Sequence, residues 1–131
     1  MLIPDRQIDD GSLAIFAAEA VRLLCSGNFA DLAERFGYAL AFDRDPAAAI
    51  GEDLSLCLAQ LHAAGFRSAP SRPAVKVRYF ARNDAGLFAL VECLVQTDKG
   101  SDVLLELVVT SKGADKHVSL EQISAAAERT R

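Results

Sequence analysis

The period of the hydrophobic pattern changes near residue 74, and this change limits the folds that are open to the chain. Before residue 74, apolar side chains recur at spacings of three and four, as in Leu13, Phe16 and Ala17, which is typical of one face of a helix. After it, apolar and polar side chains alternate, which is typical of strands with one buried face. The sequence therefore predicts an α+β domain in which three N-terminal helices pack on an antiparallel meander of about four strands.

Residues with strong capping and helix-breaking preferences mark the first two helices. The first is expected to open at residues 10–12, where Asp10 or Ser12 caps the free amides, and to end at Gly27. The second is expected over residues 28–37, with a weaker form of the capping box at its start.

The clearest boundary is Asp45-Pro46, because aspartate caps well and proline suits the first helical position. The third helix is expected to start there and to run to about Ala64, before the glycine at position 65. The preceding segment, residues 38–42, fits either a continuation of the second helix or a short strand.

Four strands are expected in the second half, over residues 74–82, 87–97, 101–111 and 117–123. Residues 84–86 and 98–100 both read Asp-X-Gly, which suits a three-residue hairpin loop with glycine in the left-handed conformation. Loops of that length fix the register, so we expect Val77 to lie beside Cys93 and Cys93 beside Leu105.

This register divides the sheet into two faces. The face expected to lie under the helices is apolar throughout, and consists of Val75, Val77, Tyr79, Ala89, Val91, Cys93, Val95, Val103, Leu105, Leu107 and Val109. The outer face is also rich in apolar side chains, and consists of Arg78, Glu92 and Glu106 in one row with Phe80, Phe88, Leu90, Leu94, Leu104 and Val108 around them. So large an apolar surface indicates an interface, and we expect these outer-face residues to form a homodimer.

One hairpin carries a resemblance to a known family. Residues 94–107, with a Gly-Ser-Asp exit from the turn and an alternating strand after it, resemble the closing hairpin of small uncharacterised bacterial members of the nuclear transport factor 2-like superfamily. The order of elements over about residues 12–123 is also similar to this superfamily, which has a cystatin-like α+β fold. The resemblance implies a curved, cone-shaped sheet that forms a pocket with the helices, and dimerisation through the outer face. Some relatives are enzymes with carboxylates, tyrosines or histidines inside the pocket.

Length, composition and charge limit the number of domains and the classes of partner that fit this chain. The 131 residues, 51% of them hydrophobic, are expected to form one domain over 1–131 with its core at about 12–123. The net charge of −4 argues against nucleic acid and anionic membranes as partners. No apolar run approaches the ~20 residues of a membrane span.

The three cysteines, Cys25, Cys57 and Cys93, lie far apart and form no CxxC pair. They are expected to be reduced, buried thiols, which favours a cytoplasmic location. The two histidines, His62 and His117, are not spaced as metal ligands, so neither a metal nor a cofactor is expected.

No catalytic residue is assigned, because general acid–base chemistry needs a proton-transferring group in the pocket and the pocket-facing strand positions are apolar. The residues expected to contact an apolar ligand, if the cone is open, are Tyr38, Asp43, Tyr79, Val91, Cys93 and Leu107. The pair Glu92 and Glu106 fits acid–base catalysis, but Arg78 in the same row favours a structural ion-pair ladder.

Two functions follow as hypotheses. The first is a non-catalytic, homodimeric interaction or accessory module that binds proteins. The second is a small-molecule pocket protein, such as an isomerase-, dehydratase- or cyclase-like enzyme acting on an apolar ligand. A filled cone favours the first, and a cavity of ~300 Å³ or more with convergent polar groups favours the second.

Overall fold

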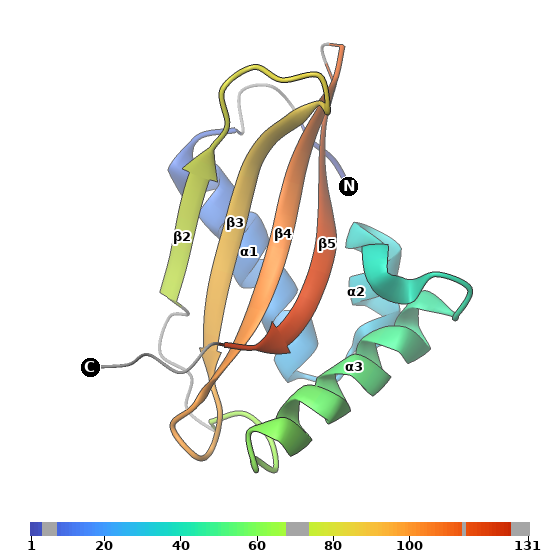
Figure 1. Ribbon diagram of the computed structural model, residues 1–131, viewed down its shortest axis with the longest axis vertical. Helices are drawn as coiled ribbons and strands as arrows, with labels where there is room; N and C mark the ends of the chain where they lie inside the picture. The colour runs from blue at the N-terminus through green and yellow to red at the C-terminus, as the bar shows by residue number, and fades with distance from the viewer. Residues whose placement is uncertain (4–7, 68–73, 114, 127–131) are drawn as a thin grey trace.

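The computed structural model describes residues 1–3, 8–67, 74–113 and 115–126. Within these residues, three α-helices pack on one face of a five-stranded antiparallel sheet, in the strand order β1-β5-β4-β3-β2 (Figure 1). The helices are α1 (Asp10–Cys25), α2 (Phe29–Phe36) and α3 (Pro46–Gln60), and the 3-10 helix η2 (Ala39–Ala41) precedes α3. The strands are β1 (Leu2–Ile3), β2 (Ala74–Tyr79), β3 (Leu87–Gln96), β4 (Asp102–Lys112) and β5 (Asp115–Ala125). The predicted α+β class is confirmed, with five strands in place of about four.

Helix α1 begins at Asp10, but its cap is Asp9, so the prediction of Asp10 or Ser12 as the cap was wrong. The Asp9 carboxylate accepts a hydrogen bond from the Ser12 backbone N–H at 2.8 Å. Gly27 ends the helix as predicted, with a φ of +75° and its N–H donating to the Leu24 carbonyl. Helix α2 also has its predicted limits, between the caps Asn28 and the glycine at position 37.

Helix α3 starts as the sequence predicts and ends earlier. The Asp45 carboxylate accepts from the Ala48 N–H at 3.0 Å, and a proline occupies the first helical position. The helix ends at Gln60 because His62 takes a φ of +54°, and the chain leaves through a Schellman-type turn in which the Ala63 N–H donates to the Leu58 carbonyl. The sequence does not show that a histidine will adopt this conformation. The prediction that α3 continues to about Ala64, before the glycine at position 65, was therefore wrong. Residues 38–42 contain the short helix η2 rather than a strand.

Strand β1 is the element that the sequence analysis missed. Two residues are too few to show an alternating pattern, yet Leu2 pairs with His117 and Ile3 with Lys116 at the edge of the sheet. Ile3 is buried and belongs to the core. The backbone of Met1 is also paired, because the Val118 N–H donates to the Met1 carbonyl at 2.7 Å.

The register is as predicted between β3 and β4, where Cys93 pairs with Leu105. It differs by two residues between β2 and β3, where Val77 pairs with Val91 instead of Cys93. The connection is longer than a three-residue hairpin loop, because β2 ends at Tyr79 and the side chain of Asn83 bonds to backbone groups at both ends of the loop that follows.

A bulge near the start of β3 places Phe88 on the opposite face from the predicted one. Leu87 pairs with Thr110 and Ala89 with Val109, so Phe88 is an extra residue in β3. Its ring packs against the core and meets the Tyr79 ring edge-on at 5.6 Å. The assignment of Phe88 to the outer face was therefore wrong.

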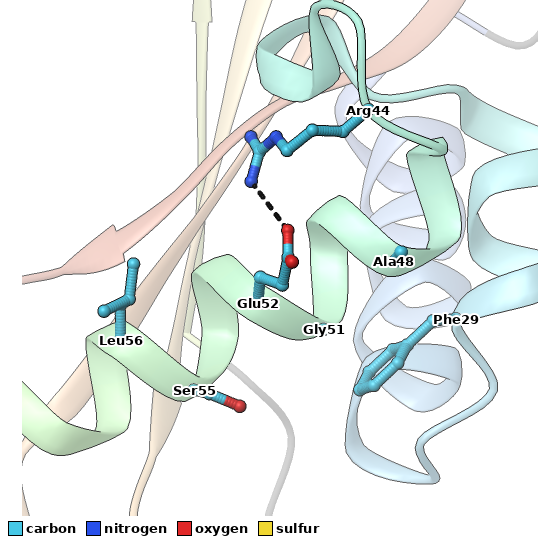
Figure 2. Close-up of a pocket in the computed structure, with 7 residues that line it drawn as sticks. All are labelled: Phe29, Arg44, Ala48, Gly51, Glu52, Ser55 and Leu56. Carbon is cyan, nitrogen blue, oxygen red and sulfur yellow. Dashed lines mark hydrogen bonds and ion pairs between the residues drawn. The ribbon is translucent and has the colours of Figure 1, made fainter.

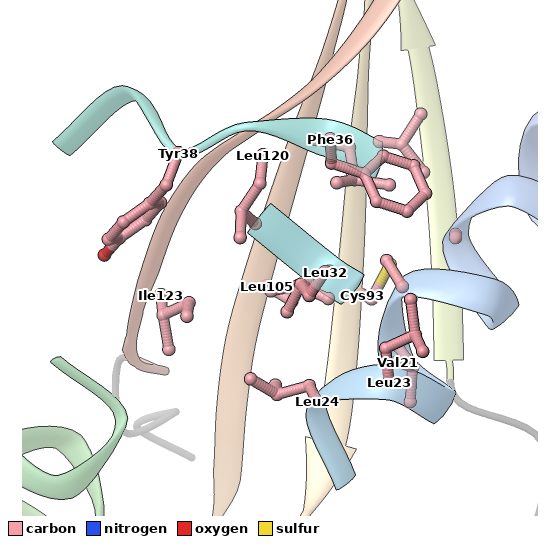
Figure 3. Packing of buried hydrophobic residues seen from close by; sticks show 14 of the residues in the cluster. Val21, Leu23, Leu24, Leu32, Phe36, Tyr38, Cys93, Leu105, Leu120 and Ile123 are labelled. Carbon is pink, nitrogen blue, oxygen red and sulfur yellow. The ribbon is translucent and has the colours of Figure 1, made fainter. Parts of the chain in front are cut away.

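The helices and the inner sheet face fill the space between them. Helix α1 packs on β2 and β3, whereas α2 and α3 pack on β5. Figure 3 shows side chains from α1, α2 and the sheet that converge on one interior, among them Leu24, Leu32 and Leu105, which are at most 1% exposed.

Replacing Ile3 by alanine tests whether β1 belongs to the folded domain. Ile3→Ala removes a side chain that is 3% exposed, so we expect the free energy of unfolding to fall by about 2–4 kcal/mol in urea titrations. The matched control is Leu2→Ala on the same strand, where the side chain is 62% exposed and the expected change is within about 0.5 kcal/mol. Equal effects of the two substitutions would contradict the burial of β1.

Candidate functional site

The predicted ligand-contacting residues do not form one site. Val91, Cys93 and Leu107 are at most 1% exposed and lie in the packed core. Burial raises the pKa of the Cys93 thiol to about 12, so this cysteine is a neutral thiol at physiological pH. The interior at these positions is occupied by side chains.

Tyr38 lies in a polar network, but its partner is Asp53 and not Asp43. The buried Tyr38 side chain donates its hydroxyl hydrogen to the Asp53 carboxylate at 2.5 Å, and Arg44 binds the same carboxylate at 3.0 Å. Asp43 is exposed on the loop before α3. Asp53 could not be identified from the sequence, because the apolar stripe of α3 gives no sign of a buried tyrosine beside the helix.

Arg44 ties the loop that precedes α3 to the helix. Its guanidinium donates to the Leu40 carbonyl at 2.6 Å and to the Ala41 carbonyl at 3.2 Å, and it forms an ion pair with Glu52 at 3.3 Å. Its hydrogen bond holds the pKa of Asp53 below the usual range, and the Tyr38 hydroxyl adds to this effect. Burial and the hydrogen bond to Asp53 raise the pKa of Tyr38 well above its usual value. At neutral pH the network therefore joins a neutral tyrosine hydroxyl to an ionised carboxylate.

Tyr79 lies at the edge of the sheet, 44% exposed, and does not point into a cavity of the core. Its hydroxyl lies 2.6 Å from an Asp10 carboxylate oxygen and 3.1 Å from the Ile8 carbonyl, which joins the end of β2 to the start of α1. Partial desolvation, followed by the bond to Asp10, raises the pKa of Tyr79 to about 12. Like Tyr38, it is held as a hydrogen-bond donor.

The outer face of the sheet carries the remaining predicted residues. Two apolar rows cross β3 and β4, where Leu94 pairs with Leu104 and Leu90 pairs with Val108. All four side chains are half-buried. In Figure 1, α1 crosses the opposite face of the sheet and α2 and α3 lie beside β5, and the end of α3 lines a cavity together with Leu94 and Leu104. The alternation of the strands has thus placed these four residues together, as predicted, with the exposed Phe80 just beyond the end of β2.

A charged row lies between the two apolar rows. Glu92 pairs with Glu106 across β3 and β4, and Lys76 of β2 pairs with Glu92 because of the two-residue difference in register. Arg78 nevertheless reaches Glu92 diagonally, at 3.5 Å. Glu106 accepts a hydrogen bond from the side-chain amide of Gln122 on β5. Each carboxylate therefore has a partner within its own chain, which the sequence predicted for Arg78 but not for Gln122.

The outer face is hollowed at the end where β2 begins. The cavity has a volume of about 1010 Å³. Its walls include Lys76, Arg78 and Glu92 on the sheet and His62 at the end of α3. None of the predicted ligand-contacting residues lines it.

A second, shallower hollow lies on the exposed side of α3. Figure 2 shows its lining, with Arg44 paired to Glu52 above the helix and the Phe29 ring of α2 at one end. Its volume is about 790 Å³, and its floor contains Gly51. The Phe29 ring would lie 3.2 Å from a Cβ atom at Gly51, so this glycine allows α2 to approach α3 closely.

The described residues contain neither a cluster of metal ligands nor a disulfide. Within them, no group of three histidine, cysteine or acidic side chains is placed to hold a metal ion, and Cys25, Cys57 and Cys93 are free thiols. No helix in the described part of the chain is long and apolar enough to span a membrane.

The Tyr38 network predicts a loss of stability at alkaline pH. The pKa of Tyr38 is higher in the folded protein than the value of about 10 in an unfolded chain, so its contribution is complete below pH 10 and is lost as the pH rises further. We expect the free energy of unfolding to fall by up to about 1.4 kcal/mol per pH unit above pH 10 through this group, and less steeply in Tyr38→Phe. Urea titrations at pH 9, 10 and 11 measure the slopes in wild type and Tyr38→Phe. Tyr79→Phe, measured in parallel, gives the separate contribution of Tyr79, because the pKa of that tyrosine is raised as well. Identical slopes in wild type and Tyr38→Phe would contradict the network.

Comparison of the chain with models of protein families, with characterised proteins and with solved structures finds no match to any of them.

Proposed function

We propose that this chain is a non-catalytic interaction module with a nuclear transport factor 2-like fold, and that it forms a homodimer through the outer face of its sheet. The observation that carries the proposal is the difference between the two sides of the sheet. The inner side is filled with side chains, whereas the outer side carries half-buried apolar rows, and among the described helices only the end of α3 approaches them.

Burial of the apolar rows supplies the driving force. Leu90, Leu94, Leu104 and Val108 are each partly exposed in the single chain. Complete burial of such a side chain stabilises by roughly 1.5–3 kcal/mol. Part of this free energy is already gained in the single chain, and a dimer would gain the rest by burying the area that is still exposed on both partners. A second copy presents the same rows, which is the requirement of an isologous contact.

The charges on this face are compatible with burial. The charged row on this face carries two cations, Lys76 and Arg78, and two carboxylates, Glu92 and Glu106, so the charges of the row balance although the chain has a net charge of −4. Arg78 and Gln122 already bind the carboxylates within the chain. This lowers the cost of removing the acids from water, since an unpaired buried carboxylate costs several kcal/mol.

The alternative, a small-molecule pocket protein or an isomerase-, dehydratase- or cyclase-like enzyme, has less support. It requires space inside the cone, beside Val91 and Leu107, which are at most 1% exposed. The cavity of about 1010 Å³ lies on the outer face instead, and none of the predicted ligand-contacting residues lines it. It also requires a group that transfers protons near neutral pH, and the pKa values of both Tyr38 and Tyr79 are raised away from that range.

Sedimentation tests the interface. We expect wild type at tens of micromolar to sediment with about twice the chain mass of 14.0 kDa. The double variant Leu94→Lys with Leu104→Glu should sediment as a monomer, because each partner loses two apolar side chains from the contact and an ion pair would have to be removed from water in their place. The two new side chains face each other across paired strands, so they form a favourable cross-strand pair and leave the fold intact.

The matched control is Ile15→Lys with Leu56→Glu, which introduces the same charges at side chains that are 69% and 64% exposed on the helices. This control should remain dimeric. A monomeric wild type, or a double variant that dimerises like wild type, would overturn the proposal.

A further inference from the structure

The two edges of the sheet differ. On one side, β1 pairs with the first part of β5. On the other side, β2 is the last strand in the order, so within the described residues its outer edge has no strand partner. An open strand edge is a template for one more strand.

The backbone groups along this edge can be assigned from the register. The Phe80 N–H donates to the Phe88 carbonyl at 2.9 Å, and in an antiparallel ladder every second residue points its N–H and C=O groups toward the neighbouring strand. The even-numbered residues of β2 therefore bond to β3. Val75, Val77 and Tyr79 direct their backbone groups away from β3, toward the open edge.

The side chains of β2 indicate what the edge would accept. Lys76 and Arg78 are exposed on the outer face, and Val75 and Val77 are half-buried on the inner face. An added strand would place acidic side chains beside the two cations and apolar side chains beside the two valines.

A second copy of this chain does not suit the edge. Antiparallel pairing of β2 with itself would bring the cations at Lys76 and Arg78 of one chain beside those of the other, and like charges in neighbouring strands are destabilising. We propose that the open edge of β2 binds an extended acidic segment of a partner protein as a sixth, antiparallel strand. This site uses the backbone groups along the edge of β2, whereas the proposed homodimer uses the apolar rows on β3 and β4, and Lys76 and Arg78 lie between the two sites.

Synthetic peptides test the proposal. The probe is acetyl-Thr-Val-Glu-Val-Glu-Val-Thr-amide, and the control has lysine in place of both glutamates. We expect the glutamate peptide to slow hydrogen exchange of the Val75, Val77 and Tyr79 backbone amides in NMR spectra, and the lysine peptide to have no effect. Lys76→Glu should weaken binding of the glutamate peptide about fivefold to thirtyfold, whereas Lys99→Glu in an exposed turn should leave it unchanged.

N-methylation separates strand addition from simple charge attraction. Methyl groups on the peptide amides that face β2 should abolish binding, and methyl groups on the alternate amides should preserve it, because only the first set donates to β2. Lys76 and Arg78 would serve only to keep other strands away if neither peptide protects these amides at millimolar concentration. That result, or equal binding of the glutamate and lysine peptides or of the two methylated peptides, would overturn the proposal. Sedimentation of the same samples shows whether the outer-face dimer is present, so the two proposals fail independently.

Discussion

The inner face of the β3–β4 ladder is the surface against which the rest of the domain is assembled. Its eight side chains, Ala89, Val91, Cys93 and Val95 on β3 and Val103, Leu105, Leu107 and Val109 on β4, are at most 5% exposed. They contain no hydrogen-bonding group stronger than a thiol, so only other apolar side chains can cover them without cost. The helices supply that cover, and their packing there leaves no space beside these residues for a ligand. This apolar interior also determines where the candidate sites lie. Their polar groups are found at the margins of the core or on the outer face of the sheet.

The sequence predicted the fold where several local signals agree. Asp45 and Pro46 each favour a helix start at the same position, and the turn at residues 98–100 sets a register that continues through β3 and β4. The prediction failed at two helix ends, where a single residue decides the boundary. The left-handed His62 ends α3 early, and Asp9 caps α1 in place of its neighbour, so these boundaries moved by a few residues at most.

The two errors in the sheet had different consequences. The register between β2 and β3 differed by two residues, and a shift of two keeps every side chain on its predicted face. The outer face therefore retained its cations, although Lys76 rather than Arg78 became the direct neighbour of Glu92. The bulge at Phe88 is a shift of one, and that single residue moved to the inner face. The Tyr38–Asp53–Arg44 network was beyond prediction, because it depends on how the loop before α3 folds back on the helix, and periodicity carries no information about that.

Strand β1 closes the longest loop in the domain. The terminal ammonium of Met1 donates to the carbonyl of Val118 at 2.6 Å, across a separation of 117 positions in the sequence. The hairpins of the meander join neighbours in the chain and form on a microsecond scale, whereas the ends must wait until the helices and strands between them are in place. We therefore expect β1 to dock late in folding, and its pairing with β5 to open early on partial unfolding. Its amides should exchange faster than those of β3 and β4, which makes the N-terminal strand a sensitive indicator of whether the domain is complete.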